Sequence, residues 1–279
     1  MIRKGLWKGR SRSAVITMAI TFALSGGAVR AEEGEEAENE GWNGSIALSG
    51  NAQTGTTDSF SGSFDAATDR AFNEARDEVK ARFNATYGVT RDSSDTPTKK
   101  ETTANSQRLD LGHKHVFNPT LFWGSNSFAE RDTTQSLEVR AAADTGPGIR
   151  LWSRDPVDES HFDINFGPGY RYELYDGNTG AGVDDNGDAD HFIDVVGGFE
   201  YKNQLFDDKV DFTHTGSIRM AANEPNAFLV RSEIIFSLPL TTAWSFRTGF
   251  LVEYNNDPGS DDVLNKTTTR TSLGLDYKF

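Results

Sequence analysis

The sequence predicts an all-β fold: an antiparallel up-and-down transmembrane β-barrel of about 12 strands. Three observations indicate it. Many segments alternate apolar and polar residues, long and short polar links separate these segments, and the chain ends on a strongly alternating segment that closes with Phe279. Alternation with a period of two gives a strand one apolar and one polar face. A closed barrel places all the apolar faces in lipid and leaves no open edge.

The C-terminal segment, residues 266–279, shows the clearest alternation in the chain. Its apolar face ends in Leu273, Leu275, Tyr277 and Phe279. A soluble protein rarely leaves such a strand uncovered, because its open edge favours aggregation. The pattern resembles the C-terminal signal that the barrel-assembly machinery reads in bacterial outer-membrane proteins. We therefore expect these four residues to form an assembly signal and that machinery to be a partner; an ordinary sandwich strand is the alternative.

Residues 1–31 are typical of a cleavable signal peptide. A basic region precedes a short apolar run at 14–24, and Val29-Arg30-Ala31 fits a cleavage site. The apolar run is too short to cross a bilayer as a helix, which takes about 20 residues. Residues 32–41 are rich in glutamate, and we expect a disordered acidic leader there. The barrel domain is then expected to span 42–279.

The first six predicted strands differ in how clearly they alternate. They lie near 42–50, 60–66, 78–89, 104–116, 121–130 and 135–152. The fifth has no clear parity, which can mark a β-bulge. In the sixth we expect one apolar face made of Leu137, Val139, Ala141 and Ala143. Glu138 and Arg140 are expected on the opposite face.

The six later strands alternate more regularly. They are predicted near 162–174, 193–201, 209–220, 228–238, 244–254 and 266–279. Aromatic residues collect near the strand ends, as in the interface girdles of membrane barrels. The aromatic residues in question are Trp42, Trp123, Trp244, Tyr254, Tyr277 and Phe279.

The links between strands separate a barrel from a sandwich. The third, seventh and eleventh links are long and polar: 91–103, 176–189 and 255–265. The fourth, eighth and tenth are short: 117–120, 203–208 and 239–243. Such alternation is expected of a barrel with external loops and periplasmic turns, and an even strand count places both termini in the periplasm. The sixth link, 153–160, is longer than a turn and is a mild exception.

Most strand charges would then point into the lumen, where acidic and basic residues nearly balance. A barrel of about 12 strands lies between the small filled barrels and the wide porins. Opposite charges could therefore pair across the lumen and leave little free cross-section. The predicted lumen-lining residues are Lys80, Arg82, Arg108, Asp110, Arg171, Glu173, Arg219, Arg231, Glu233, Arg247, Glu253 and Arg270.

The composition argues against several functions and partners. The chain has a net charge of −14, and its first 31 residues carry basic side chains and no acid, so the rest is more acidic still. Binding to nucleic acid is therefore not expected. The absence of cysteine excludes disulfides, thiolate metal sites and a cysteine-linked lipid anchor. Outer-membrane lipid and lipopolysaccharide are the expected surroundings.

No motif in the sequence assigns an enzyme activity, a metal or a cofactor. Residues 184–190 place oxygen-bearing side chains at every second position, but Ala189 and Val195 stand where an EF-hand needs glycine and glutamate. A solvated acidic loop is the simpler interpretation, and divalent cations bridging lipopolysaccharide are the alternative. The five histidines have no accompanying serine motif. We therefore predict no catalytic residues, although an enzyme site at the barrel rim remains an alternative.

Three stretches carry a family resemblance: residues 42–51, residues 130–140 followed by Gly146-Pro147-Gly148, and Gly167-Pro168-Gly169-Tyr170. The chain resembles an uncharacterised bacterial family, a domain of unknown function whose members are called salt-induced outer-membrane proteins. The resemblance covers 42–279. It implies an outer-membrane location and a link to salt or osmotic stress, and it supplies no catalytic residue and no ligand.

The expectation is thus a barrel in the outer membrane of a Gram-negative bacterium, exported through a cleavable signal peptide. Its expected role is structural or related to salt and osmotic stress, with a narrow charged lumen. A selective channel for a small solute is the alternative.

Overall fold

The structure is a computed structural model that describes residues 42–53, 57–73, 76–92, 99–154, 160–175, 189–257 and 266–279. The predicted signal peptide, the acidic leader and most of the acidic segment 184–190 lie outside these ranges. The described residues contain no helix long and apolar enough to cross a membrane.

The described residues form twelve strands and one short 3-10 helix, η1. In chain order the elements are β1 (Asn43–Gln53), β2 (Thr57–Phe72), β3 (Asp77–Asp92), β4 (Lys99–Val116), β5 (Leu121–Asp132), η1 (Thr133–Gln135), β6 (Leu137–Ser153), β7 (His161–Tyr175), β8 (Ala189–Leu205), β9 (Val210–Ala221), β10 (Phe228–Pro239), β11 (Trp244–Asn255) and β12 (Thr267–Lys278). The predicted all-β barrel is confirmed: each strand pairs antiparallel with its chain neighbours, and β1 pairs with β12 to close the sheet.

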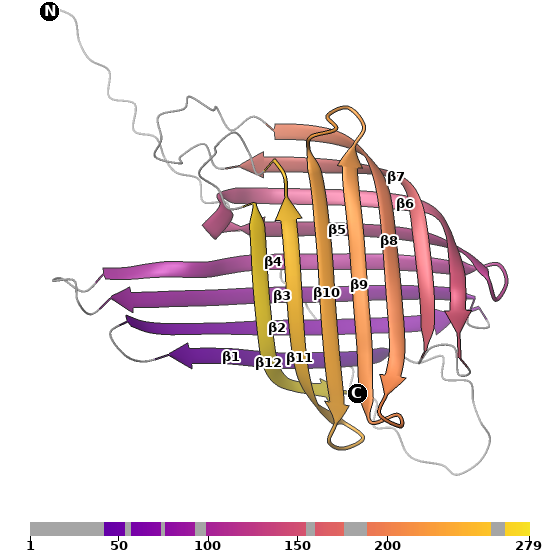
Figure 1. Cartoon of the computed structure of the whole chain (residues 1–279), viewed down its shortest axis with the longest axis horizontal. Coiled ribbons are helices and arrows are strands. Elements are labelled where there is room, and N and C mark those ends of the chain that lie inside the picture. Colours follow the sequence, from indigo (N-terminus) through magenta and orange to yellow (C-terminus); the bar gives the residue numbers. More distant parts are fainter. Residues whose placement is uncertain are drawn as a thin grey trace, which may run out of the picture. The chain divides into compact units, whose positions relative to one another are not determined.

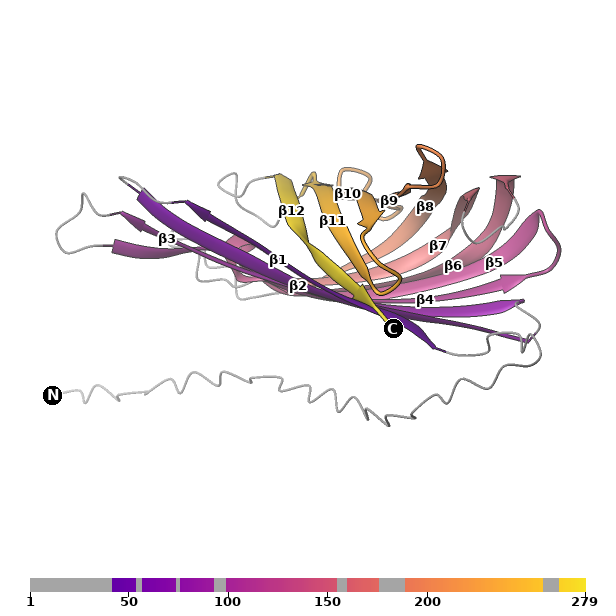
Figure 2. The ribbon, with the colours of Figure 1, turned by 90° about the horizontal axis from the view of Figure 1, so that it is seen from below.

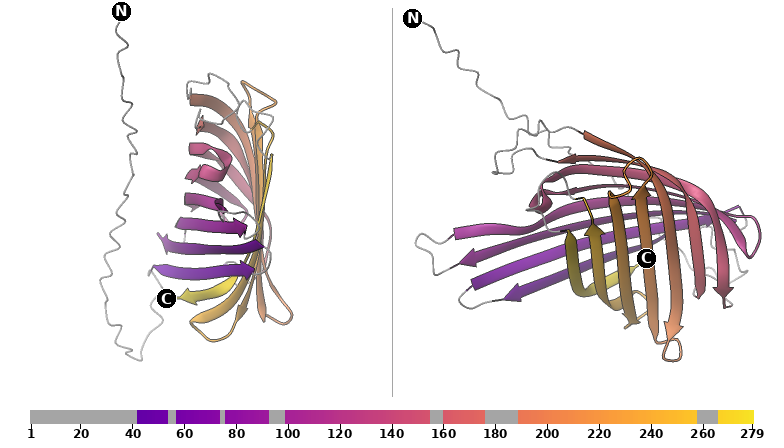
Figure 3. Two further views of the ribbon diagram at one scale, coloured as in Figure 1. Left: turned by 90° about the vertical axis from the view of Figure 1, so that its left-hand side faces the viewer. Right: turned by 45° about the horizontal axis from the view of Figure 1, so that its top comes forward.

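The barrel is flattened into two facing walls. Figure 1 shows β9–β12 crossing in front of the layer that β1–β4 form, and Figure 2 shows the two layers from below. Figure 3 shows the wall bending from one layer into the other through β6–β8. Because the walls lie face to face, long side chains from one wall can reach the other.

The two ends of the barrel differ in what they carry. At one end, here called the proximal end, the start of β1 meets the end of the chain: Gly44 and Phe279 exchange two backbone hydrogen bonds of 3.1 and 3.0 Å. The links that follow the even-numbered strands, from β2 to β10, lie at this proximal end. The opposite, distal end carries η1 and the last residues of the odd-numbered strands, from β1 to β11.

The outer surface is apolar, and aromatic residues mark the proximal strand ends. Trp42, Trp123, Trp244 and Phe279 are all exposed there. The rings of Trp244 and Tyr277 lie 5.0 Å apart. Alternation explains this surface, because every second residue of each strand must face outward.

The parity predicted for the start of β6 is wrong. Leu137 is buried, with 1% of its surface exposed, and Glu138 is exposed. The register of β6 against β7 shifts between Leu137 and Val139, which is a β-bulge. A bulge adds one residue to one strand and reverses which side chains face inward. Beyond it, Arg140 faces inward, as predicted.

Strand β5, whose parity the sequence left open, turns two phenylalanines inward. Phe122 and Phe128 are each 7% exposed, whereas Trp123 between them is exposed. The register against β6 is irregular between Glu130 and Asp132, at the distal end of the strand. An inward face that carries aromatic as well as charged residues hides the alternation on which the sequence argument depends.

Candidate functional site: a lumen crossed by ion pairs

All twelve residues predicted to line the lumen take part in ion pairs. Several pairs join strands that are not neighbours in the sheet, so their side chains span the barrel interior. These pairs are Lys80–Glu200, Arg82–Glu233, Lys114–Asp163, Arg140–Glu253, Arg219–Asp144, Arg247–Asp65 and Arg270–Asp132. The charges therefore connect the two walls, and they fall into three groups along the barrel.

The central group is built on Arg82 of β3 and Glu233 of β10. Two guanidinium nitrogens of Arg82 donate hydrogen bonds of 2.7 Å each to the two carboxylate oxygens of Glu233. The Nε atom of Arg82 donates to Asp65 of β2 at 2.8 Å, and Arg247 of β11 reaches Asp65 at 3.1 Å. Two-point contact between a guanidinium and a carboxylate fixes both distance and orientation. We call the Arg82–Glu233 contact the central bridge.

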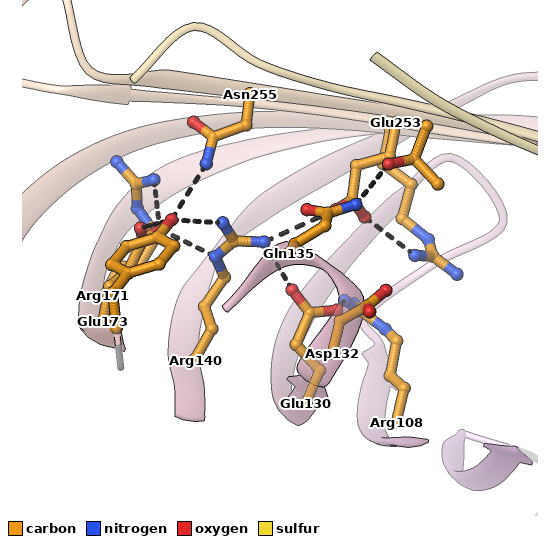
Figure 4. Close-up of polar contacts among 12 residues, drawn as sticks. Arg108, Glu130, Asp132, Gln135, Arg140, Arg171, Glu173, Glu253 and Asn255 are labelled. Atoms are coloured by element: carbon orange, nitrogen blue, oxygen red, sulfur yellow. Dashed lines mark hydrogen bonds and ion pairs between the residues drawn. The ribbon is translucent and has the colours of Figure 1, made fainter. Parts of the chain in front are cut away.

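The distal group is centred on Arg140 of β6. Its Nε atom lies 2.7 Å from Glu173, and its Nη1 atom lies 2.6 Å from Glu130 and 3.4 Å from Glu253 (Figure 4). The side chains of Arg140 and Glu173 are each 1% exposed. Glu253 belongs to β11, so this group also spans the lumen.

Neighbouring residues extend the distal group. Arg171 lies 2.7 Å from Glu173, and the hydroxyl of Tyr175 donates to Glu173 at 2.8 Å. From the other wall, the Asn255 side chain donates to the Tyr175 hydroxyl at 3.2 Å. Gln135 of η1 forms a hydrogen bond with Thr268 of β12. We call this assembly around Arg140 the distal network; its contacts reach from β6 and β7 to β11 near the distal end (Figure 4).

The proximal group joins β3, β4, β6, β7 and β8. Asp163 accepts hydrogen bonds from Lys114 and, at 2.8 Å, from Arg150. Glu200 lies 3.5 Å from Lys80 and 2.9 Å from the Nε2 atom of His161. Burying so many charges is tolerable because each has a partner of opposite sign.

Aromatic rings lie beneath several of these cations. The guanidinium of Arg108 lies 3.8 Å from the ring centre of Phe128, and that of Arg219 lies 5.1 Å from the same ring. The ammonium of Lys114 lies 4.5 Å from the ring centre of Phe122. A cation is attracted to the face of an aromatic ring, more strongly where water is excluded. These inward phenylalanines hold the lumen cations in place.

Sequence reasoning missed several acids that complete the groups. Asp65, Asp144, Glu130 and Asp132 pair with lumen arginines. Asp65 could have been found, because it lies between the apolar residues of the second strand and so shares the polar face. Glu130 and Asp132 lie beside the irregular registers of β5 and β6, where alternation gives no answer.

Two cavities of the described part of the barrel flank the central bridge. One has a volume of about 360 Å³ and lies between β3–β5 and β8–β10. The other, of about 270 Å³, is lined by residues of β1–β3 and β10–β12. Both are lined by Arg82, Arg231 and Glu233, so the central bridge lies at the boundary between them. The interior is thus divided into compartments by charged side chains.

The histidines form contacts of other kinds. His113 and His115 both approach the Asp77 carboxylate, at 3.4 and 2.7 Å, near the proximal end. His214 shares a hydrogen bond of 3.0 Å with Ser232 and packs edge-on against Phe199. Within the described ranges no three His, Cys, Asp or Glu side chains are grouped so that they could hold a metal ion.

The fold and its interior define a closed β-barrel whose lumen is crossed by ion pairs. Residues 46–279 match the family described as "Protein of unknown function, DUF481". The chain belongs to this family. Comparison with curated proteins gave no match.

Solved structures similar to the chain are also barrels. The translocator domain of the autotransporter NalP from Neisseria meningitidis is 11% identical, with a TM-score of 0.43, and the match covers 85% of this chain and 87% of that one. The NanC porin is 8% identical, with a TM-score of 0.42, over 84% of this chain and 97% of that one. The KdgM porin is 9% identical, with a TM-score of 0.40, over 85% and 99%.

Proposed function

We propose that the protein is an integral outer-membrane barrel of a Gram-negative cell envelope whose narrow lumen is held closed by ion pairs. Its role in this proposal is to maintain the envelope under changing salt or osmotic conditions. The observation that carries the proposal is the central bridge: Arg82 and Glu233 come from opposite walls and meet through two hydrogen bonds of 2.7 Å.

The surface of the barrel supports a membrane location. Large apolar side chains are exposed along the outward faces, from Leu48 of β1 to Phe166 of β7 and Leu273 of β12. Exposed apolar area of this extent would favour aggregation in water but is stable in lipid. Charged side chains pair in the interior instead.

The differing exposure of the three groups supports a response to salt. The central bridge is partly open to solvent, since the side chains of Arg82 and Glu233 are 28% and 13% exposed. The Arg140–Glu173 pair of the distal network is only 1% exposed on either side. Salt weakens accessible ion pairs more than buried ones. Raised ionic strength is therefore expected to loosen the centre of the lumen while the distal network stays intact.

Single-channel recording tests the proposal. The protein, purified from membranes, is inserted into planar lipid bilayers, with heat-dependent gel mobility as the check that it is folded. We expect little or no conductance in the wild type and larger current steps in Arg82→Ala. The matched control is Arg154→Ala, because Arg154 pairs with Asp208 at the exposed proximal links, 3.4 Å apart. Wide steps in the wild type, or equal steps in Arg82→Ala and the control, would contradict a lumen closed by the central bridge.

The two cavities favour one second candidate, a selective channel for a small polar solute. The lining of the larger cavity has as many basic as acidic side chains, which suits a neutral or zwitterionic solute better than an ion. Swelling of protein-containing liposomes in glycine, compared with potassium gluconate, tests this candidate. Swelling that is faster in glycine than in liposomes without protein would favour the channel.

A further inference from the structure

The barrel is closed by the pairing of β1 with β12, here called the seam. These two strands pair along only part of their length. The two strands pair from Ser45↔Lys278 to Ser49↔Gly274, a register of five residue pairs. On their other sides, β1 pairs with β2 as far as Gln53, and β12 pairs with β11 as far as Thr267. In Figure 1, β12 runs beside β1 only near the C-terminus and then turns away from it. No described strand pairs with this distal part of the β12 edge.

Gly274 marks the point where the seam stops closing. A side chain placed there would lie 2.1 Å from the backbone oxygen of Leu48. The two backbones are therefore in tight contact at this residue. Beyond it, Gly50 on β1 and Leu273 on β12 are next in register but are not paired. A row of unpaired backbone groups facing lipid is costly, so something has to cover it.

The smaller cavity lies at this gap. It is lined by every residue of β12 from Arg270 to Gly274. Leu273 and Phe250 also line it, and their side chains are 55% and 46% exposed. The cavity therefore borders the unpaired part of the β12 edge, and exposed apolar side chains are among the residues that line it.

The two ends of this cavity differ in chemistry. Its inward lining carries four guanidinium groups and two carboxylates. The arginines are Arg82, Arg231, Arg247 and Arg270, and the acids are Asp65 and Glu233. Guanidinium groups bind phosphate oxygens through several parallel hydrogen bonds. The carboxylate partners of Arg231 and Arg270 are Glu253 and Asp132, which do not line the cavity, so guanidinium groups outnumber carboxylates in its lining. A pocket of this kind beside exposed apolar side chains matches a molecule with a phosphate headgroup and acyl chains.

We propose that the distal part of the β1–β12 seam is a lateral opening that binds a phosphate-bearing lipid. The headgroup lies in the lumen against Arg247 and Arg270, and the acyl chains leave beside Leu273 and Phe250. The bound lipid covers the unpaired strand edges. This inference rests on the proposed outer-membrane location, because only a bilayer supplies such a ligand from the side.

Photo-crosslinking in vesicles tests the opening. The protein is inserted into phosphatidylcholine vesicles that contain a small fraction of phosphatidic acid with a photoreactive group beside the phosphate. Lipid that only surrounds the barrel can label outward residues but not inward ones. We expect labelling of the inward residues Arg270 and Ser272, mapped by mass spectrometry. The control is phosphatidylcholine with the same photoreactive group, which we expect to label these two residues at least several-fold less.

Two sets of variants make the test specific. The chain has no cysteine, so Gly50→Cys with Leu273→Cys can close the gap by a disulfide, and inward labelling should then fall several-fold and return on reduction. Leu48→Cys with Leu275→Cys, on the paired part of the seam, controls for oxidation. Arg270→Gln should lower the labelling of Ser272 even if the first pair does not oxidise.

The outcomes separate this inference from the proposed function. If the protein inserts and folds but both lipids label the inward residues equally, or if neither the disulfide nor Arg270→Gln changes labelling, the lateral opening is wrong and the outer-membrane barrel stands. If the protein does not insert into vesicles, both proposals are wrong.

Discussion

Arg140 and Glu173 face each other from β6 and β7, with the Nε atom of the arginine 2.7 Å from a carboxylate oxygen, and water reaches neither side chain. Each also contacts further partners, so neither charge depends on one contact alone. Such a pair contributes little net stability when complete, but removal of one half leaves the other buried charge incompletely compensated. This asymmetry gives the first prediction.

Arg140→Ala is expected to lower the free energy of unfolding by about 3 kcal/mol, because the buried Glu173 would keep its charge with only Arg171 as a cationic partner, and Glu130 would keep only Arg108. Unfolding by urea in detergent micelles, followed by tryptophan fluorescence, measures the change. Arg154→Ala should change stability by less than about 0.5 kcal/mol, since its ion pair is exposed. Equal effects of the two substitutions would show that the distal network is not buried as described.

Exchanging the two charges of the central bridge should partly restore it. Arg82→Glu or Glu233→Arg alone places like charges opposite each other, and we expect larger current steps from either. The double variant recovers an opposite pair between the same strands, so its conductance should return towards that of the wild type. A double variant that conducts as much as both single changes together would show that Arg82 and Glu233 do not act on one another.

Ionic strength should affect the wild type and Arg82→Ala differently. The Debye length falls from about 10 Å at 0.1 M salt to about 3 Å at 1 M. Weakening of the central bridge should therefore raise the wild-type conductance more steeply than the conductivity of the bath. Arg82→Ala, which lacks the bridge, should follow the bath. Single-channel conductance of both proteins is recorded over this range of potassium chloride concentration. If both conductances rise in parallel with salt, the Arg82–Glu233 pair does not make the conductance sensitive to salt.

The rings beneath the lumen cations should contribute measurable stability. Phe128→Leu keeps an apolar side chain but removes the ring under Arg108 and Arg219, and we expect a loss of about 1 kcal/mol in unfolding free energy. Phe166→Leu, at a side chain that is 61% exposed on the outer face, is the matched control and should cost less. Urea unfolding of both variants measures the two losses in unfolding free energy. A larger loss for Phe166→Leu than for Phe128→Leu would contradict the cation–ring contribution.

The terminal residue should matter for assembly in cells. Phe279 exchanges two backbone hydrogen bonds with Gly44, and its ring covers that glycine. Phe279→Ala retains the backbone contacts but removes the ring on which the predicted assembly signal ends. We expect less folded protein in the outer-membrane fraction, measured by heat-dependent gel mobility. Refolding in detergent should change little, and an unchanged amount in cells would exclude Phe279 from the assembly signal.

Alternation in the sequence predicted the strands and the inward direction of their charges, because period and parity are local properties. The inward direction of Arg82 and of Arg219 could be predicted from the apolar residues on either side of each. The partners of these residues were not predictable. Arg82 and Glu233 are 151 residues apart, and which residues meet depends on how the walls cross and on how far the barrel is flattened.

The predictions of strand parity failed where the alternation of apolar and polar residues is interrupted. The bulge between Leu137 and Val139 shifts parity by one residue, and nothing in the alternating pattern shows where the extra residue lies. Phe122 and Phe128 conceal the inward face of β5 because aromatic residues normally indicate the outer face. Their inward position follows from cations on other strands, which no local pattern reveals.

The order of strands around the barrel has a consequence for folding kinetics. All other pairs of hydrogen-bonded strands are consecutive in the chain, but β1 and β12 are the first and the last described strand. Joining them requires closure of the longest loop, whose entropy cost must be met before the contact is gained. The ion pairs between the walls also depend on this step, since an unclosed sheet holds its charges apart. The pairing of β12 with β1 therefore controls when the ion pairs between the walls can form, and this closure should be the rate-limiting step of folding.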